Sequence, residues 1–533
     1  ERLEAPEMID SEDRLGFDGL SSERFLDSEA ASVILREAAD KAVEDAEPPP
    51  EPPLQPMVFI YVVLVAMGGA LFGLEISNIS TAHELLCNHD FASVCGPKAK
   101  STAFFQGLVT SCITIGAFFG TATSGIPQER LGRKFTLVVA SVIYIVGVVI
   151  EIVSPSYAIL VTGRILVGVG VGWFAATVPM YIAELSPSSI RGRLVTANQL
   201  NICIGILLGY VVNWGFAGGA SPPSATAWRW ILGVGVAPAA VLFFAFLLVT
   251  PRSPRWLAKQ HRHEEARQVL LSLRGDYPAF VEWELQGMIS ATTESASGWA
   301  KLREPAAMRT VLVGIAISVI QQIVGVNSVN GYAPQILVSA GFSGKSSLTL
   351  SIVIGVVKVG FVAVALGLMD CLGRKTLLIG GTVVMGASMI VLGVLLDKYS
   401  SDPPTSVAWG SASMLFLAMA SFELGQGPVV WLLMSEIFPL NIRGAAMSLG
   451  SASNFLFNFI VMLTFPLLKS PHALGEGGVF YLYSGICFAS CVFIGVFVPE
   501  TRGRTLEDIE QVFRRGTDRK PASSAAVGLA LNQ

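Results

Sequence analysis

The sequence predicts an all-α membrane protein whose chain crosses the bilayer twelve times. Of its 533 residues, 52% are hydrophobic and only 14% are charged, whereas a soluble domain carries roughly 25% charged residues. The mean hydropathy is +0.59. Twelve apolar runs follow residue 56, each near the length of about twenty residues that an α-helix needs to cross the hydrocarbon core. The predicted class is therefore a polytopic helical membrane protein.

The first segment, residues 1–56, differs from the rest of the chain in charge. Residues 1–51 hold sixteen Asp or Glu against five Lys or Arg, and the segment ends in a proline-rich stretch. Such a composition cannot bury enough apolar surface to offset the entropy of the chain. We therefore expect a disordered acidic tail.

The first span runs from Met57 to Ile79, and it has no charged residue before Glu75. The other eleven spans are expected at 101–124, 135–153, 159–182, 195–216, 229–250, 308–340, 347–368, 375–396, 408–435, 445–470 and 477–498.

The longest internal loop, residues 251–307, divides the spans six and six. Its Ser253-Pro254 pair is a good helix start, and apolar residues follow at helical spacing. We expect a helical linker between an N-terminal half, 57–250, and a C-terminal half, 308–498, with a C-terminal tail at 499–533.

Basic residues lie in alternate short loops, and such loops mark the cytosolic side of a membrane protein. Both termini and the linker are therefore expected in the cytosol. The loop that holds Cys87 and Cys95 is then external, where conditions permit a disulfide; the sequence leaves open whether these two cysteines are bonded. The basic residues are Arg130, Arg133, Lys134, Arg191, Arg193, Arg374, Lys375 and Arg443.

Charged motifs repeat between the halves. ERLGRK at 129–134 corresponds to DCLGRK at 370–375, and a Glu followed seven residues later by Arg occurs after both the fourth and the tenth span. Two similar halves suit alternating access, in which one half rocks against the other around a central site. We interpret these residues as cytosolic gate charges that pair across the halves when that side closes; alternatively, the arginines only set topology and contact lipid headgroups. The gate charges are Glu129, Arg130, Arg133, Glu184, Arg191, Asp370, Arg374, Glu436 and Arg443.

Polar side chains inside the spans are the candidate site. Glu75 is an ionisable residue in a span, which is costly and therefore a functional hypothesis. Amides both donate and accept hydrogen bonds and so suit a ligand made of vicinal hydroxyls, although a single amide more often joins two helices. The amides are Gln199, Gln321, Gln322, Asn327, Asn454 and Asn458.

Eight motifs occur in order at the span ends, and on these the chain resembles the sugar porter family of the major facilitator superfamily from about residue 57 to 512. The motifs are ERLGRK (129–134), GRILVGVGVG (163–172), AELSPSSIRGR (183–193), PRSPRWL (251–257), QQIVGVNSVNGY (321–332), DCLGRK (370–375), GQGPVVWLLMSEIFP (425–439) with NIRG (441–444), and VPETRGRTLEDI (498–509).

The resemblance implies the major facilitator fold and a central sugar site lined by the amides, with Trp431 as a wall. Tyr332 and Glu423 belong to the same lining by resemblance. Lys358 stands where many hexose carriers have a sugar-binding asparagine, as in polyol-type subgroups. Arg252 stands where the family often has glutamate.

The resemblance also assigns a proton-coupling pair. Glu75 occupies the position that is aspartate in proton-coupled sugar porters, and Arg164 matches their arginine. A guanidinium keeps its charge, so the carboxylate can take up and release a proton as the helices move. The alternative is a permanent ion pair that only holds two helices together.

We therefore expect a proton-coupled importer of a monosaccharide, a hexose, in the plasma membrane, functional as a monomer. The alternatives are a facilitative uniporter and a polyol, pentose or disaccharide carrier; a sugar sensor without transport is disfavoured by the short C-terminal tail. No nucleophile and base pair, metal-ligand spacing or nucleotide motif occurs, so the sequence indicates no enzyme, cofactor, metal or nucleic acid partner. Its partners are the sugar, protons and the lipid bilayer.

Overall fold

A computed structural model of the chain describes residues 49–96, 102–187, 189–218, 224–293, 302, 305–399, 403–439, 442–504 and 509. These residues form helices and no strand. Among them, twelve helical segments are long and apolar enough to cross a membrane, which confirms the predicted class. The predicted acidic tail lies outside the described residues up to residue 48.

The first half contains the helices that the first six apolar runs predict, together with two short helices, α4 and α6. They are α3 (Pro56–Asn88), α4 (Ala92–Cys95), α5 (Thr102–Thr123), α6 (Gly125–Arg130), α7 (Gly132–Val153), α8 (Tyr157–Leu185), α9 (Arg191–Asn213) with a π-helical turn at Trp214–Gly218, α10 (Ala227–Gly233) and α11 (Val236–Leu248).

The described part of the linker folds into three short helices around an apolar core of its own. As expected, Ser253 caps the first of them, because its hydroxyl accepts a hydrogen bond from the Trp256 amide at 3.1 Å. The helices are α12 (Pro254–Lys259), α13 (His263–Arg274) and α14 (Pro278–Thr293).

The second half repeats the plan of the first. Its helices are α16 (Pro305–Ile323), α17 (Val326–Gly331), α18 (Ala333–Ser339), α19 (Gly344–Leu372), α20 (Arg374–Lys398), α21 (Thr405–Leu424), α22 (Gln426–Ile437), α23 (Arg443–Lys469) and α24 (Gly475–Phe497).

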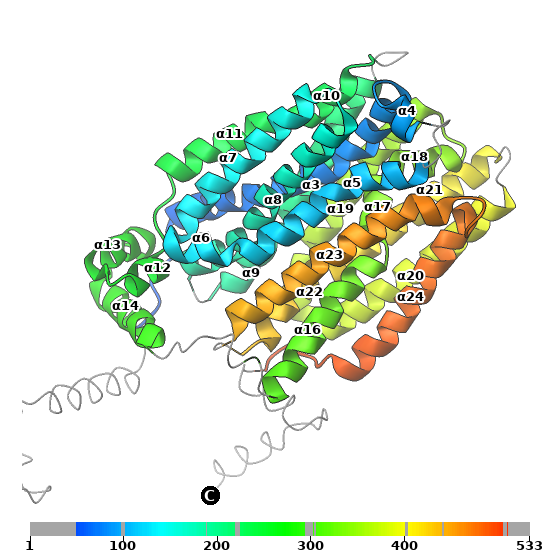
Figure 1. Cartoon of the computed structure of the whole chain (residues 1–533). Helices are drawn as coiled ribbons and strands as arrows, with labels where there is room; N and C mark the ends of the chain where they lie inside the picture. The colour runs from blue at the N-terminus through cyan, green and yellow to red at the C-terminus, as the bar shows by residue number, and fades with distance from the viewer. Residues whose placement is uncertain are drawn as a thin grey trace, which may run out of the picture.

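The two halves lie side by side, with α5 packed against α23 and α9 packed against α19 (Figure 1). The linker helices α12–α14 lie at one end of the bundle, which we call the linker side. Helix α4, whose Cys95 forms a disulfide with Cys87, and the nearby α18 lie at the opposite end, which we call the disulfide side (Figure 1).

Besides the run 229–250, which is divided between α10 and α11, two of the predicted spans are broken rather than continuous. The run 308–340 contains α16, α17 and α18, and the first break falls at Gly325, whose φ of 88° is left-handed and favours glycine. The run 408–435 is divided at Gly425 into α21 and α22. Non-helical backbone at this depth is tolerated where it lines a cavity, and these breaks border the site described below.

Glycines of α8 allow its neighbours to approach closely. A Cβ atom on Gly168 would overlap the Ile113 carbonyl oxygen of α5, and one on Gly170 would lie 3.0 Å from the Ala140 carbonyl oxygen of α7. Small residues at helix interfaces permit such contact in membrane proteins. Helices α5, α7 and α8 therefore form one tightly packed group.

We expect Gly168→Ala to lower the stability of the protein by about 1–3 kcal/mol, because overpacking forces backbones apart. Thermal unfolding in detergent would measure the effect. Gly485→Ala is the matched control, since a Cβ at Gly485 meets nothing within 4 Å. Equal melting temperatures for the two variants would contradict the packing argument.

Candidate functional site

A cavity of about 120 Å³ lies between the two halves. Helices α3, α8 and α9 of the first half line it, together with α16, α17, α19, α21, α22 and α23 of the second. Eight of the ten residues assigned to the substrate site from the sequence contribute to its walls. They are Gln199, Gln321, Gln322, Asn327, Lys358, Glu423, Trp431 and Asn454.

The other two residues, Tyr332 and Asn458, lie outside the lining. The Tyr332 ring stacks on Phe465 at 4.9 Å between centroids and meets the His83 ring at 5.2 Å. Asn458 is buried, and in the described part of the chain neither atom of its amide has a hydrogen-bond partner.

The cavity extends toward the linker side and is closed at the disulfide side. Its lining includes Thr196 near the start of α9 and Ser435 near the end of α22. Toward the disulfide side the halves are joined, because the Tyr210 hydroxyl of α9 donates to the Asn330 carbonyl at 2.9 Å. The Gln335 amide of α18 donates to the Ser80 carbonyl of α3, also at 2.9 Å.

Four amides of the second half form a connected chain of hydrogen bonds. Asn327 donates to the Gln322 side chain at 2.8 Å, and Gln322 donates to Asn454 at 2.9 Å. Asn454 in turn donates to Gln321 at 2.8 Å, and Gln321 donates to the Gln426 carbonyl at 2.7 Å. Each amide is thereby held in one orientation, so the wall presents fixed donors and acceptors to the cavity.

A buried ion pair forms another part of the wall. The Lys358 Nζ atom lies 2.5 Å from the Glu423 Oε1 atom, and both side chains are almost completely buried. The Gln199 amide of the first half donates to the other Glu423 oxygen at 3.2 Å. Lys358 and Glu423 were each assigned to the substrate site, but the sequence did not reveal that they neutralise one another or that Gln199 joins them across the halves.

Aromatic side chains complete the cavity. Trp431 of α22 is half-buried in the lining. Phe72 of α3 and Phe455 of α23, which face each other from opposite halves, have ring centroids 5.6 Å apart in an edge-to-face arrangement. A lining of apolar rings with a few fixed polar groups is typical of small-molecule sites.

A cluster of buried charged groups lies within the first half, beside the cavity. The Arg164 Nη1 atom lies 3.6 Å from Glu75 Oε2, so the structure brings together the pair assigned from the sequence. The Tyr144 hydroxyl donates to Glu75 Oε1 at 2.6 Å. Glu75 does not itself line the cavity, but Phe72 and Ile76 of the same helix do.

Glu151 is a member of this cluster that the sequence reasoning missed. Its Oε2 atom lies 3.5 Å from the same Arg164 nitrogen, and its side chain is fully buried. The signal was present, because Glu151 lies within a predicted span and the rule that marks Glu75 applies equally to it.

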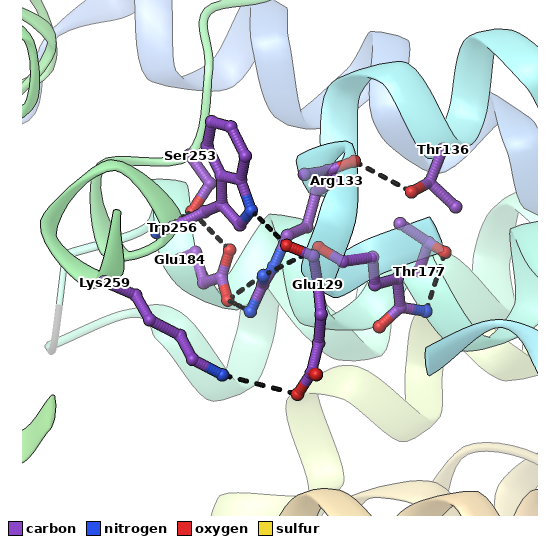
Figure 2. Close-up of polar contacts among 10 residues, drawn as sticks. Glu129, Arg133, Thr136, Thr177, Glu184, Ser253, Trp256 and Lys259 are labelled. Atoms are coloured by element: carbon purple, nitrogen blue, oxygen red, sulfur yellow. Dashed lines mark hydrogen bonds and ion pairs between the residues drawn. The ribbon is translucent and has the colours of Figure 1, made fainter. Parts of the chain in front are cut away.

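Three gate charges of the first half, Glu129, Arg133 and Glu184, lie close together beside the linker helix α12 (Figure 2). The Arg133 guanidinium donates to Glu184 Oε1 at 2.7 Å, and the Ser253 hydroxyl donates to Glu184 Oε2 at 2.5 Å. Trp256 of α12 donates to the Glu129 carbonyl at 3.0 Å, and Lys259 pairs with the Glu129 carboxylate at 3.3 Å. The linker is thus attached to both ends of this charge cluster.

The second half has an equivalent cluster. Arg374 pairs with Glu436 at 3.1 Å, and the Thr501 hydroxyl donates to the other Glu436 oxygen at 2.5 Å. Glu500 accepts hydrogen bonds from the backbone amides of Arg374 and Lys375 at 2.9 and 3.1 Å. Each of these Arg–Glu pairs thus lies inside its own half and does not join the two halves.

The remaining gate charges are placed as follows. Arg130 is exposed at the end of α6, and Arg443 donates to the Phe438 carbonyl at 3.1 Å. The side chains of Arg191 and Asp370 lie outside the described part of the structure.

At the disulfide side, Cys87 and Cys95 are joined by a disulfide. The bond connects the end of α3 to the short helix α4, and both cysteines are buried. Among the described residues, no cluster of His, Cys, Asp or Glu side chains could hold a metal ion.

Comparison with known proteins places this architecture among transporters. The family model described as sugar (and other) transporter matches residues 61–513. The glucose transporter GlcP of Staphylococcus epidermidis is 34% identical over 86% of this chain and 98% of its own length. The galactose-proton symporter of Escherichia coli K12 is 33% identical over 86% of this chain and 95% of its own. A partially occluded inward open structure of the xylose transporter XylE from E. coli matches with a TM-score of 0.74 and 28% identity, over 85% of this chain and all of that one.

The close Lys358–Glu423 contact predicts that the two side chains depend on each other for the stability of the protein. We expect Lys358→Met to destabilise the protein by about 3–5 kcal/mol, because it leaves a buried carboxylate without its counter-ion. The double variant Lys358→Met with Glu423→Gln should regain much of that loss. Thermal unfolding of the two single variants and the double variant in detergent would measure the cycle, and additive losses would contradict the pairing.

Proposed function

The chain belongs to the sugar transporter family, and from that premise we propose that it imports a monosaccharide together with a proton across the plasma membrane by alternating access. The observation that carries the proposal is the position of α3. One face of this helix lines the amide-walled cavity, and the same helix holds Glu75 against Arg164. A change in sugar occupancy can therefore alter the environment of a carboxylate that binds a proton.

The cavity wall supports a sugar as the substrate. Its amides present both donors and acceptors in fixed orientations, and Trp431 offers an apolar face, which together suit a ring bearing vicinal hydroxyls. The named substrates of the relatives are glucose, galactose and xylose. We favour a hexose.

The arrangement of the halves supports alternating access with the linker side in the cytosol. The cavity extends toward the linker side, while hydrogen bonds join the halves at the disulfide side. Basic residues at the linker side agree with cytosolic termini. Closing the cavity there would bring α9 toward α22 and α23, and a monomer contains every part that this movement needs.

A second candidate differs in the substrate. The Lys358–Glu423 pair places an ammonium and a carboxylate in the wall where the resemblance expects an asparagine. This pair favours a polyol over a pyranose ring, since a flexible chain of hydroxyls can reach both charges. Competition of labelled sugar uptake by unlabelled glucose, galactose, xylose, sorbitol and myo-inositol would separate the two.

Glu75→Gln should abolish accumulation of substrate against a gradient while leaving exchange across the membrane intact. Glutamine keeps the size of the side chain but cannot take up a proton. Uptake into proteoliposomes with an imposed pH gradient, with and without a protonophore, would measure accumulation, and counterflow at equal pH would measure exchange.

The matched control is Glu476→Gln, which removes a carboxylate from α24 that pairs with Lys469 at 3.0 Å, away from the cavity. This variant should accumulate substrate as the wild type does. Accumulation by Glu75→Gln that still depends on pH would exclude Glu75 as the coupling group. Wild-type uptake that ignores the protonophore would identify a uniporter instead.

Asn327→Ala should raise the apparent KM for substrate about tenfold with little change in kcat, because a substrate hydroxyl and the Gln322 amide would each lose a partner. Initial rates of uptake across a concentration series would test this. Asn201→Ala is the control, since that amide bonds to the Ala197 carbonyl of its own helix and does not line the cavity. An unchanged KM for Asn327→Ala would place the substrate elsewhere.

A further inference from the structure

Three ionisable side chains meet inside the first half without contact with solvent. Glu75, Glu151 and Arg164 each have no exposed side-chain surface. One Arg164 nitrogen, Nη1, lies at nearly equal distances from the two carboxylates, 3.6 Å from Glu75 and 3.5 Å from Glu151. The guanidinium forms no hydrogen bond with either of them. The guanidinium therefore lies between two carboxylates and is not hydrogen-bonded to either.

The charges of this cluster do not balance unless it binds a proton. Two ionised carboxylates and one guanidinium leave one net negative charge in an apolar interior, where uncompensated charge is costly. A proton on Glu75 makes the cluster neutral, provided that Arg164 then neutralises Glu151. Without Glu151 the preference for the protonated form would reverse. The unprotonated Glu75–Arg164 pair would be neutral, and protonation of Glu75 would leave an isolated guanidinium.

The surroundings distinguish the two acids. Glu75 accepts a hydrogen bond from Tyr144, whereas among the described residues neither oxygen of Glu151 has a hydrogen-bond partner. Glu151 thus depends on Arg164, while Glu75 keeps the Tyr144 bond when the guanidinium is further away.

The other titratable groups near the cluster leave this balance unchanged while they are neutral or paired. His83 of α3 is buried, and its Nδ1 atom donates to the Ile79 carbonyl at 2.9 Å, as a neutral imidazole can. The Cys112 thiol of α5 lies near Arg164 and is neutral as a thiol. Arg229 of α10 is bonded to Asp90 and to the Ile152 and Ser154 carbonyls at the end of α7. Helix α11, which also packs on α7, carries no titratable residue.

The helices that carry the two acids differ in their freedom to move. Glu151 and Arg164 lie on α7 and α8, which are in close contact, since a Cβ on Gly163 would lie 3.0 Å from the Glu151 Cγ atom. Glu75 lies on α3, whose neighbouring residues Phe72 and Ile76 line the cavity. Movement of α3 with substrate would therefore change the distance from Arg164 to Glu75 while the distance to Glu151 is kept.

We propose that Glu151 is a second counter-ion for Arg164, which holds the guanidinium when Glu75 carries the transported proton. Glu151 is thus a positioning residue for the coupling step. It makes the proton-loaded cluster the neutral one, while the transported proton stays on Glu75. This inference rests on the proposed proton coupling and adds to it a residue that sets the pH range in which coupling operates.

The test compares proton movement in wild-type protein, Glu151→Gln and Glu151→Met, each reconstituted in proteoliposomes. D-glucose, D-galactose and D-xylose are the probes, and the sugar that the wild type transports fastest is used throughout. An internal pH-sensitive dye reports sugar-dependent proton uptake as the external pH is varied. Counterflow at equal pH reports the amount of functional protein, so a variant that folds poorly is recognised and the other neutral variant is used in its place.

We expect both variants to shift the pH of half-maximal proton uptake to more acidic values by about one unit or more, the size of effect that a charge within about 4–6 Å produces. Counterflow should be unchanged. Glu476→Gln, which removes a carboxylate remote from the cluster, should keep the wild-type profile.

The outcomes separate the two proposals. A wild-type profile in both Glu151 variants would overturn the counter-ion role and leave proton-coupled import standing. Complete loss of sugar-dependent proton uptake at every pH with counterflow intact would also overturn it, because Glu151 would then carry the proton itself. Absence of sugar-dependent proton uptake in the wild type would refute the proposed coupling, and the inference would fall with it.

Discussion

The structure depends on how charge is neutralised inside an apolar helix bundle. An isolated ion there is costly, so each buried charge needs a partner on a neighbouring helix. In the second half this requirement is met by one close pair, Lys358 and Glu423 at 2.5 Å. In the first half it is met loosely, by one guanidinium between two carboxylates. A close pair favours a single arrangement of its helices, whereas a shared cation has two nearly equal ones. The second half therefore holds a fixed ion pair, and the first half holds a charge cluster that can rearrange.

Helix α3 contacts both the cavity and the charge cluster of the first half. A Cβ on Gly69 would lie 3.3 Å from the Asn198 backbone oxygen of α9, so the two helices pack backbone to backbone. Close packing without large side chains lets α3 and α9 move together as the halves rock. Since Phe72 touches the cavity and Glu75 lies one turn further along, such a movement reaches the substrate and the charge cluster at the same time. Substrate binding and proton binding can therefore be coupled through α3 alone.

The fold could be predicted from the sequence because hydropathy, loop charge and repeated motifs are local properties of the chain. The breaks inside the spans could not, because glycine within an apolar run is compatible with a continuous helix. The left-handed Gly325 lies against the Tyr483 ring of α24, a contact between distant parts of the chain. Five residues of the cavity lining were likewise found because their amides stand out against an apolar background, namely Gln199, Gln321, Gln322, Asn327 and Asn454. Partner choice was not, since Lys358 and Glu423 are 65 positions apart in the sequence and nothing in their neighbours indicates the contact.

The linker side shows that two similar halves need not be held in the same way. In the second half, Glu500 accepts hydrogen bonds at the start of α20, where a carboxylate is stabilised by the positive end of the helix dipole. Arg252 occupies the corresponding place in the first half and cannot accept such bonds; its guanidinium lies 3.9 Å from Glu265 of α13. The start of α7 is held instead through Trp256 and Glu129, which belong to the linker helix and to α6. The linker helices are therefore bonded to the first half, through Ser253 to Glu184 and through Trp256 and Lys259 to Glu129.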